Sequence, residues 1–272
     1  MHPADYPVRY LRYRSTAGWE PVDDRVIAEA AVELAVNGQP WLSFACTPTR
    51  LDALAAGFLF NEGVIQSRAE IAAVDVCPQG DHVDVWLEHP AERPAFWQRT
   101  SGCTGGVTGV GADENEAIGP GEPEAVLEPE EVASIEPEML LLGMERLLAA
   151  QDLYREAGGV HSSALYDGQI IRAQAEDIGR HNTLDKLAGI LLLEEIVLKR
   201  AILFTTGRIS SEMLQKSARL GASVVVSRTS PTSQSVFLAR QKGITLVGYA
   251  RRNGFQVYTH AARIRLQGDA AR

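Results

Sequence analysis

Residues 201–250 read AILFTTGRISSEMLQKSARLGASVVVSRTSPTSQSVFLARQKGITLVGYA, and this stretch decides the expected fold. Three apolar runs of strand length are separated by two stretches of about ten residues with helical character. Strands and helices that alternate in this way indicate right-handed βαβ units, which build a parallel sheet. We therefore predict an α/β fold, with strands at 201–207, 222–228 and 244–250 and helices at Ser210–Leu220 and Pro231–Lys242.

Polar and basic side chains follow each of these predicted strands. Open α/β sheets bind ligands beyond the carboxyl ends of their strands, where helix N-termini also offer free N–H groups to anions. Residues 199–265 contain twelve Lys or Arg side chains and one acidic residue, Glu212, in a chain whose net charge is −9. A solvated basic surface explains this charge equally well, but its place at the strand ends favours a phosphate-bearing ligand. The side chains expected at this edge are Arg208, Arg228, Arg251 and Arg252, with Thr206, Gly207, Ser210 and Ser230.

The first hundred residues indicate antiparallel strands and one helix. Asn37-Gly38 lies between two alternating apolar segments and predicts a hairpin. A helix is expected to follow, with Thr47 as its N-cap and Gly63 just beyond its end. Residues 71–88 resemble a second hairpin.

The glycine- and acid-rich stretch 105–129 shows no periodicity and predicts a loop or linker. Residues 137–159 predict one long amphipathic helix, and residues 160–174 a hairpin that turns at Asp167-Gly168. We therefore expect a β-rich, α+β N-terminal subdomain at 1–125 and an α/β domain at 126–272.

Composition limits the class of protein. A chain of 272 residues with 45% apolar and 22% charged side chains is typical of a soluble globular protein of one or two domains. Its first residues lack the apolar run of a signal peptide, and no segment approaches the roughly 20 apolar residues of a membrane span. Three cysteines without a C-x-x-C pair argue against a disulfide framework and a structural zinc site. We expect a cytoplasmic protein.

One cysteine stands in an unusual setting. Cys46 and Cys77 lie among aliphatic residues, as small buried hydrophobes do. Cys103 instead lies in RTSGCTGGVTGVG, residues 99–111, where glycines leave the sulfur unshielded. We expect an exposed thiol that can reach a partner.

A second unusual stretch is AEDIGRHNTLDK, residues 175–186, which concentrates polar side chains at an expected helix start. His181 and Asp185 fall one turn apart, where a carboxylate would hold the imidazole charged or fix its tautomer. A capped helix start with a surface ion pair is the simpler alternative, and the density of polar groups favours a ligand contact. His161 fits a satisfied hairpin histidine at least as well as a site residue. The polar side chains of this stretch are Asp177, Arg180, His181, Asn182, Asp185 and Lys186.

Several long motifs resemble the formate dehydrogenase accessory sulfurtransferases, the FdhD family. They are GGVHSSAL, EDIGRHNTLDKLAG, TTGRISSEMLQKSARLGASVVVSR, SPTSQSVFLARQKGITLVGYAR and VYTH, and the resemblance runs from about residue 28 to residue 263. It implies a cytidine deaminase-like α/β domain with a mixed, partly parallel sheet. It also implies a cytoplasmic homodimer that accepts persulfide sulfur from a cysteine desulfurase. The sulfur then passes to the molybdenum or tungsten of a bis(pterin guanine dinucleotide) cofactor, which enters formate dehydrogenase.

The resemblance also assigns roles to residues. Cys103 lies where the family carries its sulfur-accepting loop, although Gly106 stands where many relatives have a second cysteine. The cofactor contacts implied by the family are Tyr249, Ala250, Arg251, Arg252, Asn253 and Gly254. The charge at the strand ends and the 175–186 stretch add His181, Asn182, Arg208 and Arg228 as expected cofactor contacts.

Two other classes of function stay open at this point. A chaperone could bind the cofactor and formate dehydrogenase without sulfur chemistry, and Gly106 makes this alternative worth testing. A zinc deaminase needs H-x-E and P-C-x-x-C motifs, whereas this chain has HSS at His161 and no cysteine pair. We expect no intrinsic metal and no nucleic-acid or membrane partner, and the sequence does not choose between molybdenum and tungsten.

Overall fold

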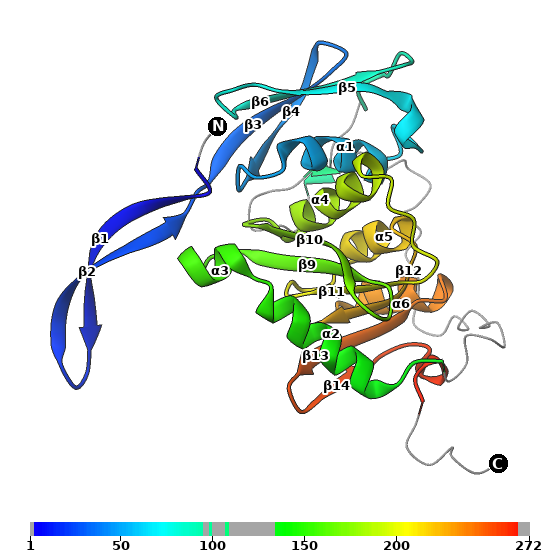
Figure 1. The fold of residues 1–272 in the computed structure, drawn as a ribbon. Coiled ribbons are helices and arrows are strands. Elements are labelled where there is room, and N and C mark those ends of the chain that lie inside the picture. Colours follow the sequence, from blue (N-terminus) through cyan, green and yellow to red (C-terminus); the bar gives the residue numbers. More distant parts are fainter. Residues whose placement is uncertain (1–2, 95–97, 100–106, 109–133, 266–272) are drawn as a thin grey trace.

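The structure is a computed structural model that describes residues 3–94, 98–99, 107–108 and 134–265. Cys103 and most of the predicted 105–129 loop lie outside the described residues. Figure 1 shows the elements stacked in layers, from a small sheet through a helical layer to a larger sheet.

The N-terminal elements form a hairpin arm and a four-stranded sheet that covers one helix. The sheet order is β4-β3-β6-β5, and its apolar face packs against α1 around Trp41, Phe58 and Val85. The elements are β1 Asp5–Arg14, β2 Gly18–Ile27, β3 Ala30–Val36, β4 Gln39–Cys46, α1 Leu51–Asn61, β5 Ile71–Val76 and β6 His82–Leu87, followed by the short strands β7 Gln98–Arg99 and β8 Val107–Thr108.

The remaining elements build a six-stranded sheet in the order β10-β9-β11-β12-β13-β14. Helices α4, α5 and α6 pack on one face, and α2 covers the other. The elements are α2 Pro137–Ala149, α3 Asp152–Ala157, β9 His161–Tyr166, β10 Ile171–Asp177, α4 Arg180–Leu193, β11 Ala201–Thr205, α5 Ser211–Arg219, β12 Ala222–Ser227, α6 Ser233–Gln241, β13 Thr245–Arg251 and β14 Gly254–Val257.

This sheet confirms the predicted α/β fold and its mixed, partly parallel character. β11, β12 and β13 run parallel, whereas β9 lies antiparallel between β10 and β11. The carboxyl ends of β10, β11, β12 and β13 therefore share one edge with the N-termini of α4, α5 and α6. We call this the carboxyl edge.

Two expected helix boundaries are wrong, and both errors have a tertiary cause. The predicted helix at 137–159 is two helices, because Glu176 of β10 accepts the N–H groups of Leu153 and Tyr154 and so starts α3 anew. α1 begins at Leu51 rather than after Thr47. Thr47 does not cap α1 because its backbone binds Asp177 of β10 and Lys186 of α4, and its hydroxyl accepts a hydrogen bond from the N–H of Ile178 between those elements.

The backbones of helices α1 and α4 approach each other closely at two glycines. A Cβ added at Gly57 would lie 1.8 Å from the carbonyl oxygen of Asp185, and one added at Gly189 would lie 1.9 Å from that of Ala53. α1 packs on the small sheet and α4 packs on the large sheet, so this crossing connects the two sheets through the helical layer (Figure 1).

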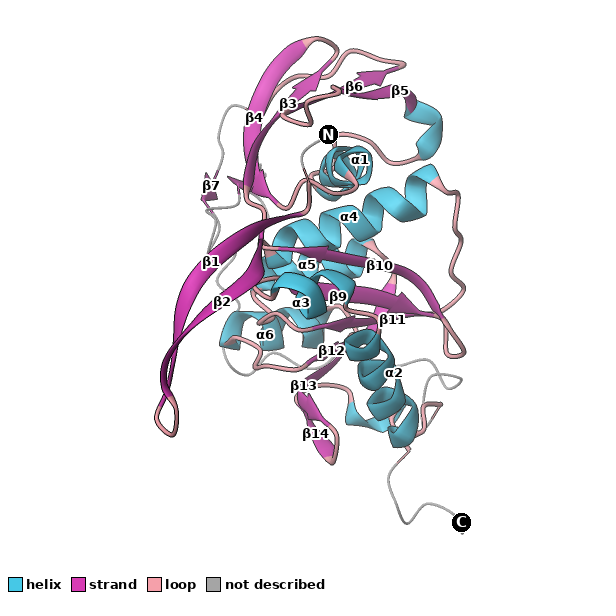
Figure 2. Ribbon diagram, turned by 60° about the vertical axis from the view of Figure 1, so that its left-hand side comes forward, coloured by secondary structure: helices cyan, strands magenta, loops and turns pink. Residues whose placement is uncertain are grey.

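The β1–β2 hairpin extends away from the rest of the molecule as an arm (Figures 1 and 2). Its base is fixed by the Ala28 N–H, which donates to the Ala4 carbonyl, and by an ion pair between Arg25 and Asp5. At its tip Leu11 and Trp19 are 66% and 69% exposed.

Across the part of the chain that the structure describes, no helix has the length and apolar character needed to cross a bilayer.

Candidate functional site

A pocket of about 500 Å³ lies between α2 and the carboxyl edge of the large sheet. Its apolar wall comes from one side of α2, and its basic rim comes from the segments that follow β12 and end β13. The lining residues are Leu141, Met144, Glu145, Leu148, Arg228, Ala250, Arg251 and Arg252.

The three arginines of this pocket are available to a ligand. Arg228, Arg251 and Arg252 are exposed. Among the described residues, no carboxylate forms an ion pair with any of them. Guanidinium groups bind phosphate oxygens through paired hydrogen bonds, so this rim suits a phosphate-bearing ligand.

A bulge in β13 places three of the lining residues. Tyr249 has a left-handed backbone (φ 51°), and the register with β14 shifts between Gly248 and Arg251. Regular alternation would turn Ala250 away from α2, because Val247 already faces α2. With the extra residue, Ala250 faces α2 as well, and Arg251 and Arg252 follow it into the pocket lining.

The pocket brings together Arg228, Ala250, Arg251 and Arg252 of the predicted contacts, but not the others. Tyr249 is 39% exposed and does not line the pocket. It lies near Tyr258, whose pKa is raised by burial and, to a smaller extent, by Tyr249. Asn253 lies in the turn before β14 and Gly254 begins β14, and both are outside the lining.

His181 lies at the carboxyl edge but is buried between α4 and α5. Its Nε2 is 3.1 Å from Glu212 Oε2. Asp185, the partner that the sequence suggests, is one turn further along α4, and both of its oxygens accept hydrogen bonds from Lys216 Nζ at 2.8 Å. His181 and Asp185 of α4 therefore pair with Glu212 and Lys216 of α5, respectively. Arg208 is exposed and lies outside the pocket lining.

His161 begins β9 at this same edge. Its pKa is lowered by burial first and then by the positive charges of Arg180 and His181. The structure therefore favours a neutral imidazole at this position.

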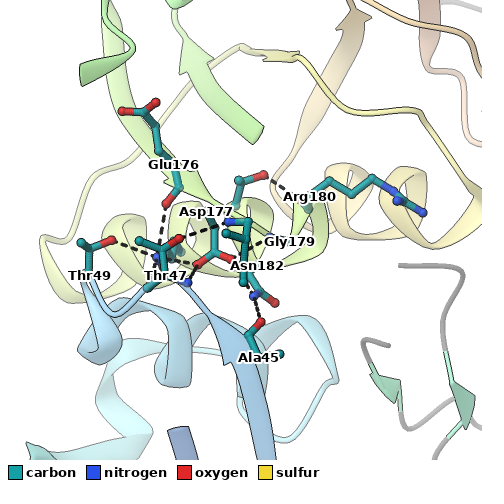
Figure 3. Close-up of polar contacts among 11 residues, drawn as sticks. Ala45, Thr47, Thr49, Glu176, Asp177, Gly179, Arg180 and Asn182 are labelled. Atoms are coloured by element: carbon teal, nitrogen blue, oxygen red, sulfur yellow. Dashed lines mark hydrogen bonds and ion pairs between the residues drawn. The ribbon is translucent and has the colours of Figure 1, made fainter. Parts of the chain in front are cut away.

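Asn182 belongs to a buried junction between the N-terminal and C-terminal elements (Figure 3). Its amide donates to the Ala45 carbonyl at 2.9 Å and to Asp177 Oδ1 at 2.8 Å. Lys186 Nζ lies 2.7 Å from Asp177 Oδ2 and donates to the Thr47 carbonyl. These contacts leave the Asn182 side chain engaged in holding α4 against the β4–α1 connection.

Comparison with known proteins identifies the family. Residues 27–265 match the FdhD/NarQ family. The chain belongs to this family. The sulfur carrier proteins FdhD of Staphylococcus aureus strains MRSA252 and Newman are each 33% identical to it over 244 residues, which is 89% of this chain and 89% of each relative.

A solved structure has the same architecture. The crystal structure of a formate dehydrogenase accessory protein from Desulfotalea psychrophila superposes with a TM-score of 0.75 and 28% identity. The match covers 96% of this chain and all of the other. Most of the β1–β2 arm precedes the segment that matches the family.

The cysteines of this FdhD/NarQ chain differ in their surroundings. Cys46 is fully buried, and burial raises the pKa of its thiol to about 12. Cys77 is half-buried, with its thiol hydrogen-bonded to Asp81. Cys103, the predicted sulfur acceptor, lies outside the described residues. Where the chain is described, no group of three or more His, Cys, Asp or Glu side chains is arranged to hold a metal ion.

Sequence reasoning missed the contribution of α2 to the pocket. Leu141, Met144 and Leu148 recur at helical spacing and indicate a buried face. This spacing does not say which end of the sheet the helix covers. The part of the lining that only the structure reveals is therefore the apolar wall and Glu145.

Proposed function

We propose that this chain is a sulfur carrier for the maturation of formate dehydrogenase. In this proposal Cys103 accepts persulfide sulfur from a cysteine desulfurase. The chain then delivers the sulfur to the molybdenum or tungsten of a bis(pterin guanine dinucleotide) cofactor. Membership of the FdhD/NarQ family and relatives named sulfur carrier proteins support this assignment.

The observation that carries the proposal is the pocket with three arginines that form no ion pair with any described carboxylate. The cofactor is the cargo, and each of its nucleotide ends bears a pyrophosphate. Arg228, Arg251 and Arg252 supply donors for these anionic oxygens. Leu141 and Met144 supply an apolar wall for a ring system. The donor set of the pocket therefore fits a nucleotide end of the cargo.

The sulfur-accepting step needs only one cysteine. The Cys103 thiolate attacks the terminal sulfur of the desulfurase persulfide, a new S–S bond forms, and the desulfurase cysteine leaves as a thiolate. The thiolate is the reactive form of cysteine, so an exposed position suits this step. No oxidant is consumed, because the transferred sulfur keeps its oxidation state.

The proposal implies several partners. The donor is a cysteine desulfurase, the client is a formate dehydrogenase, and the carrier works as a homodimer in the cytoplasm. A reducing compartment keeps the acceptor thiol free between transfers.

Mass spectrometry tests the carrier role. The full chain is incubated with a cysteine desulfurase, pyridoxal phosphate and cysteine, and its intact mass and peptides are then measured. We expect one added sulfur on the Cys103 peptide, removable by reductant and absent from Cys103→Ala. Cys77→Ala is the matched control and should still gain sulfur. An unmodified Cys103 beside an active control acceptor would contradict the proposal.

A cofactor-binding chaperone is the second candidate, and Gly106 favours it. Without a second cysteine in the loop, this chain has no intramolecular disulfide with which to rest or resolve the persulfide. A pure chaperone would still support maturation of formate dehydrogenase as Cys103→Ala, whereas a sulfur carrier would not.

A further inference from the structure

The arginine pocket also holds a carboxylate. Glu145 lies on the face of α2 that lines the pocket, one helical turn from both Leu141 and Leu148. It is exposed, and in the described part of the chain it forms no ion pair. The pocket therefore presents both a free acceptor and three free guanidinium donors.

This mixed lining restricts the chemistry of the ligand. A simple anion would be attracted by Arg228, Arg251 and Arg252 but repelled by Glu145. A ligand gains from all four groups only if it carries anionic oxygens together with N–H donors. The apolar side chains of Leu141, Met144 and Leu148 further favour a flat ring that carries these donors.

We propose that Glu145 makes this pocket selective for a guanine base. Guanine has two adjacent donors, N1–H and the 2-amino group, that can both bind one carboxylate. Its O6 and N7 are acceptors that suit an arginine, as do the phosphates of a nucleotide. Adenine lacks the 2-amino group and has an acceptor at N1, so it would leave the carboxylate unpaired.

This inference rests on the proposed function, because it assigns the recognition of the nucleotide end of the cargo to one residue. Glu145 is a specificity-determining residue in this scheme. The arginines contact phosphate and base acceptors, and the carboxylate distinguishes one base from another.

Nucleotide binding to the full chain tests the assignment. Calorimetry with GDP, IDP, XDP, ADP and CDP measures how affinity depends on the base. We expect GDP to bind at least about tenfold more tightly than ADP or CDP, and IDP to fall between them because it keeps N1–H but lacks the amino group. In Glu145→Gln, GDP affinity should fall about tenfold to a hundredfold, the usual worth of a charge-assisted hydrogen bond.

The same variant should gain affinity for XDP relative to GDP. Xanthine has a carbonyl where guanine has the amino group, and the glutamine amide can donate to it. Glu138→Gln is the matched control, since Glu138 is exposed on α2 but does not line the pocket. Arg228→Gln should instead weaken the four other nucleotides as well as GDP.

The outcomes separate the two levels of the proposal. Equal affinity for all five nucleotides, or an unchanged ranking in Glu145→Gln, would overturn the role of Glu145 and leave the nucleotide pocket standing. If none of the nucleotides binds, both the role of Glu145 and the assignment of this pocket to the cargo fail.

Discussion

Asp177 and Lys186 are almost completely buried and lie 2.7 Å apart, whereas Arg228, Arg251 and Arg252 are exposed with no carboxylate partner where the chain is described. The first pair has hydrogen-bond partners in the β4–α1 connection, in β10 and in the β10–α4 connection, and the arginines line a pocket. Burial and partners thus distinguish charges that hold the fold together from charges that are free to bind a ligand.

Replacing Lys186 by Met is expected to destabilise the fold strongly. The change leaves the Asp177 carboxylate buried without its cation, which costs about 3–5 kcal/mol. Urea unfolding followed by circular dichroism measures the loss. Lys199→Met is the control, because Lys199 is exposed and should change the free energy of unfolding by less than about 0.5 kcal/mol. A similar, small effect at Lys186 would show that the junction does not need its charge.

For single residues, the sequence predicts which side chains lie at the carboxyl edge better than it predicts whether each one binds a ligand or holds the fold together. The arginines at the strand ends could be predicted, because parallel strands bring their carboxyl ends to one edge whatever the details of packing. The burial of His181 and Asn182 could not. It depends on Glu212 of α5 and on Ala45 of β4, which are distant in the sequence.

Among the elements, the crossing of α1 and α4 makes the sharpest demand on sequence. Gly57 and Gly189 each lie against the backbone of the other helix. Both glycines sit inside helices, where glycine is intrinsically about 1 kcal/mol worse than alanine. Close approach of the two backbones therefore outweighs helix propensity at these positions.

Gly57→Ala is expected to destabilise the protein by about 3 kcal/mol, because the new methyl group would overlap the Asp185 carbonyl and push the helices apart. Helix propensity alone predicts the opposite sign, a gain of about 1 kcal/mol. Thermal or urea unfolding of the variant decides between the two, and a stabilised variant would refute the close crossing.

The elements themselves were predicted well where one segment carries its own pattern. The strands and helices of residues 201–250 have strong apolar periodicity and appear close to their expected positions. Errors arose where a distant group sets the boundary, as Glu176 does for α3 and as the junction does for Thr47. Antiparallel strands were expected in the first hundred residues, but the hairpin at residues 5–27 was not placed, because its strands are exposed on both faces and show no buried stripe.

For the molecule as a whole, the arm is an extension that projects away from the stacked layers (Figures 1 and 2). A two-stranded hairpin is at best marginally stable in isolation, so its tip contributes little to the stability of the layers. The tip instead presents Leu11, Tyr13 and Trp19 to solvent, with the two aromatic rings 5.2 Å apart.

Shortening the arm tests this separation. A chain in which residues 9–23 are replaced by Asn-Gly keeps the Val8–Asp24 pair next to the new turn, the base of the hairpin and its Arg25–Asp5 ion pair. We expect a change in Tm of no more than about 4 °C, which corresponds to about 1 kcal/mol for a chain of this size, and unchanged GDP affinity. A larger loss of Tm in differential scanning calorimetry would mean that the arm belongs to the folding core.

The glycine crossing has a consequence for how this sequence can vary over generations. Most harmful substitutions in a core can be suppressed by a second one that returns the lost volume at a neighbouring side chain. At Gly57 and Gly189 the neighbour is a peptide group, which no mutation can make smaller. A larger residue at one of these glycines therefore cannot be compensated by a substitution at the other. Selection must preserve each glycine separately in every lineage that keeps this packing.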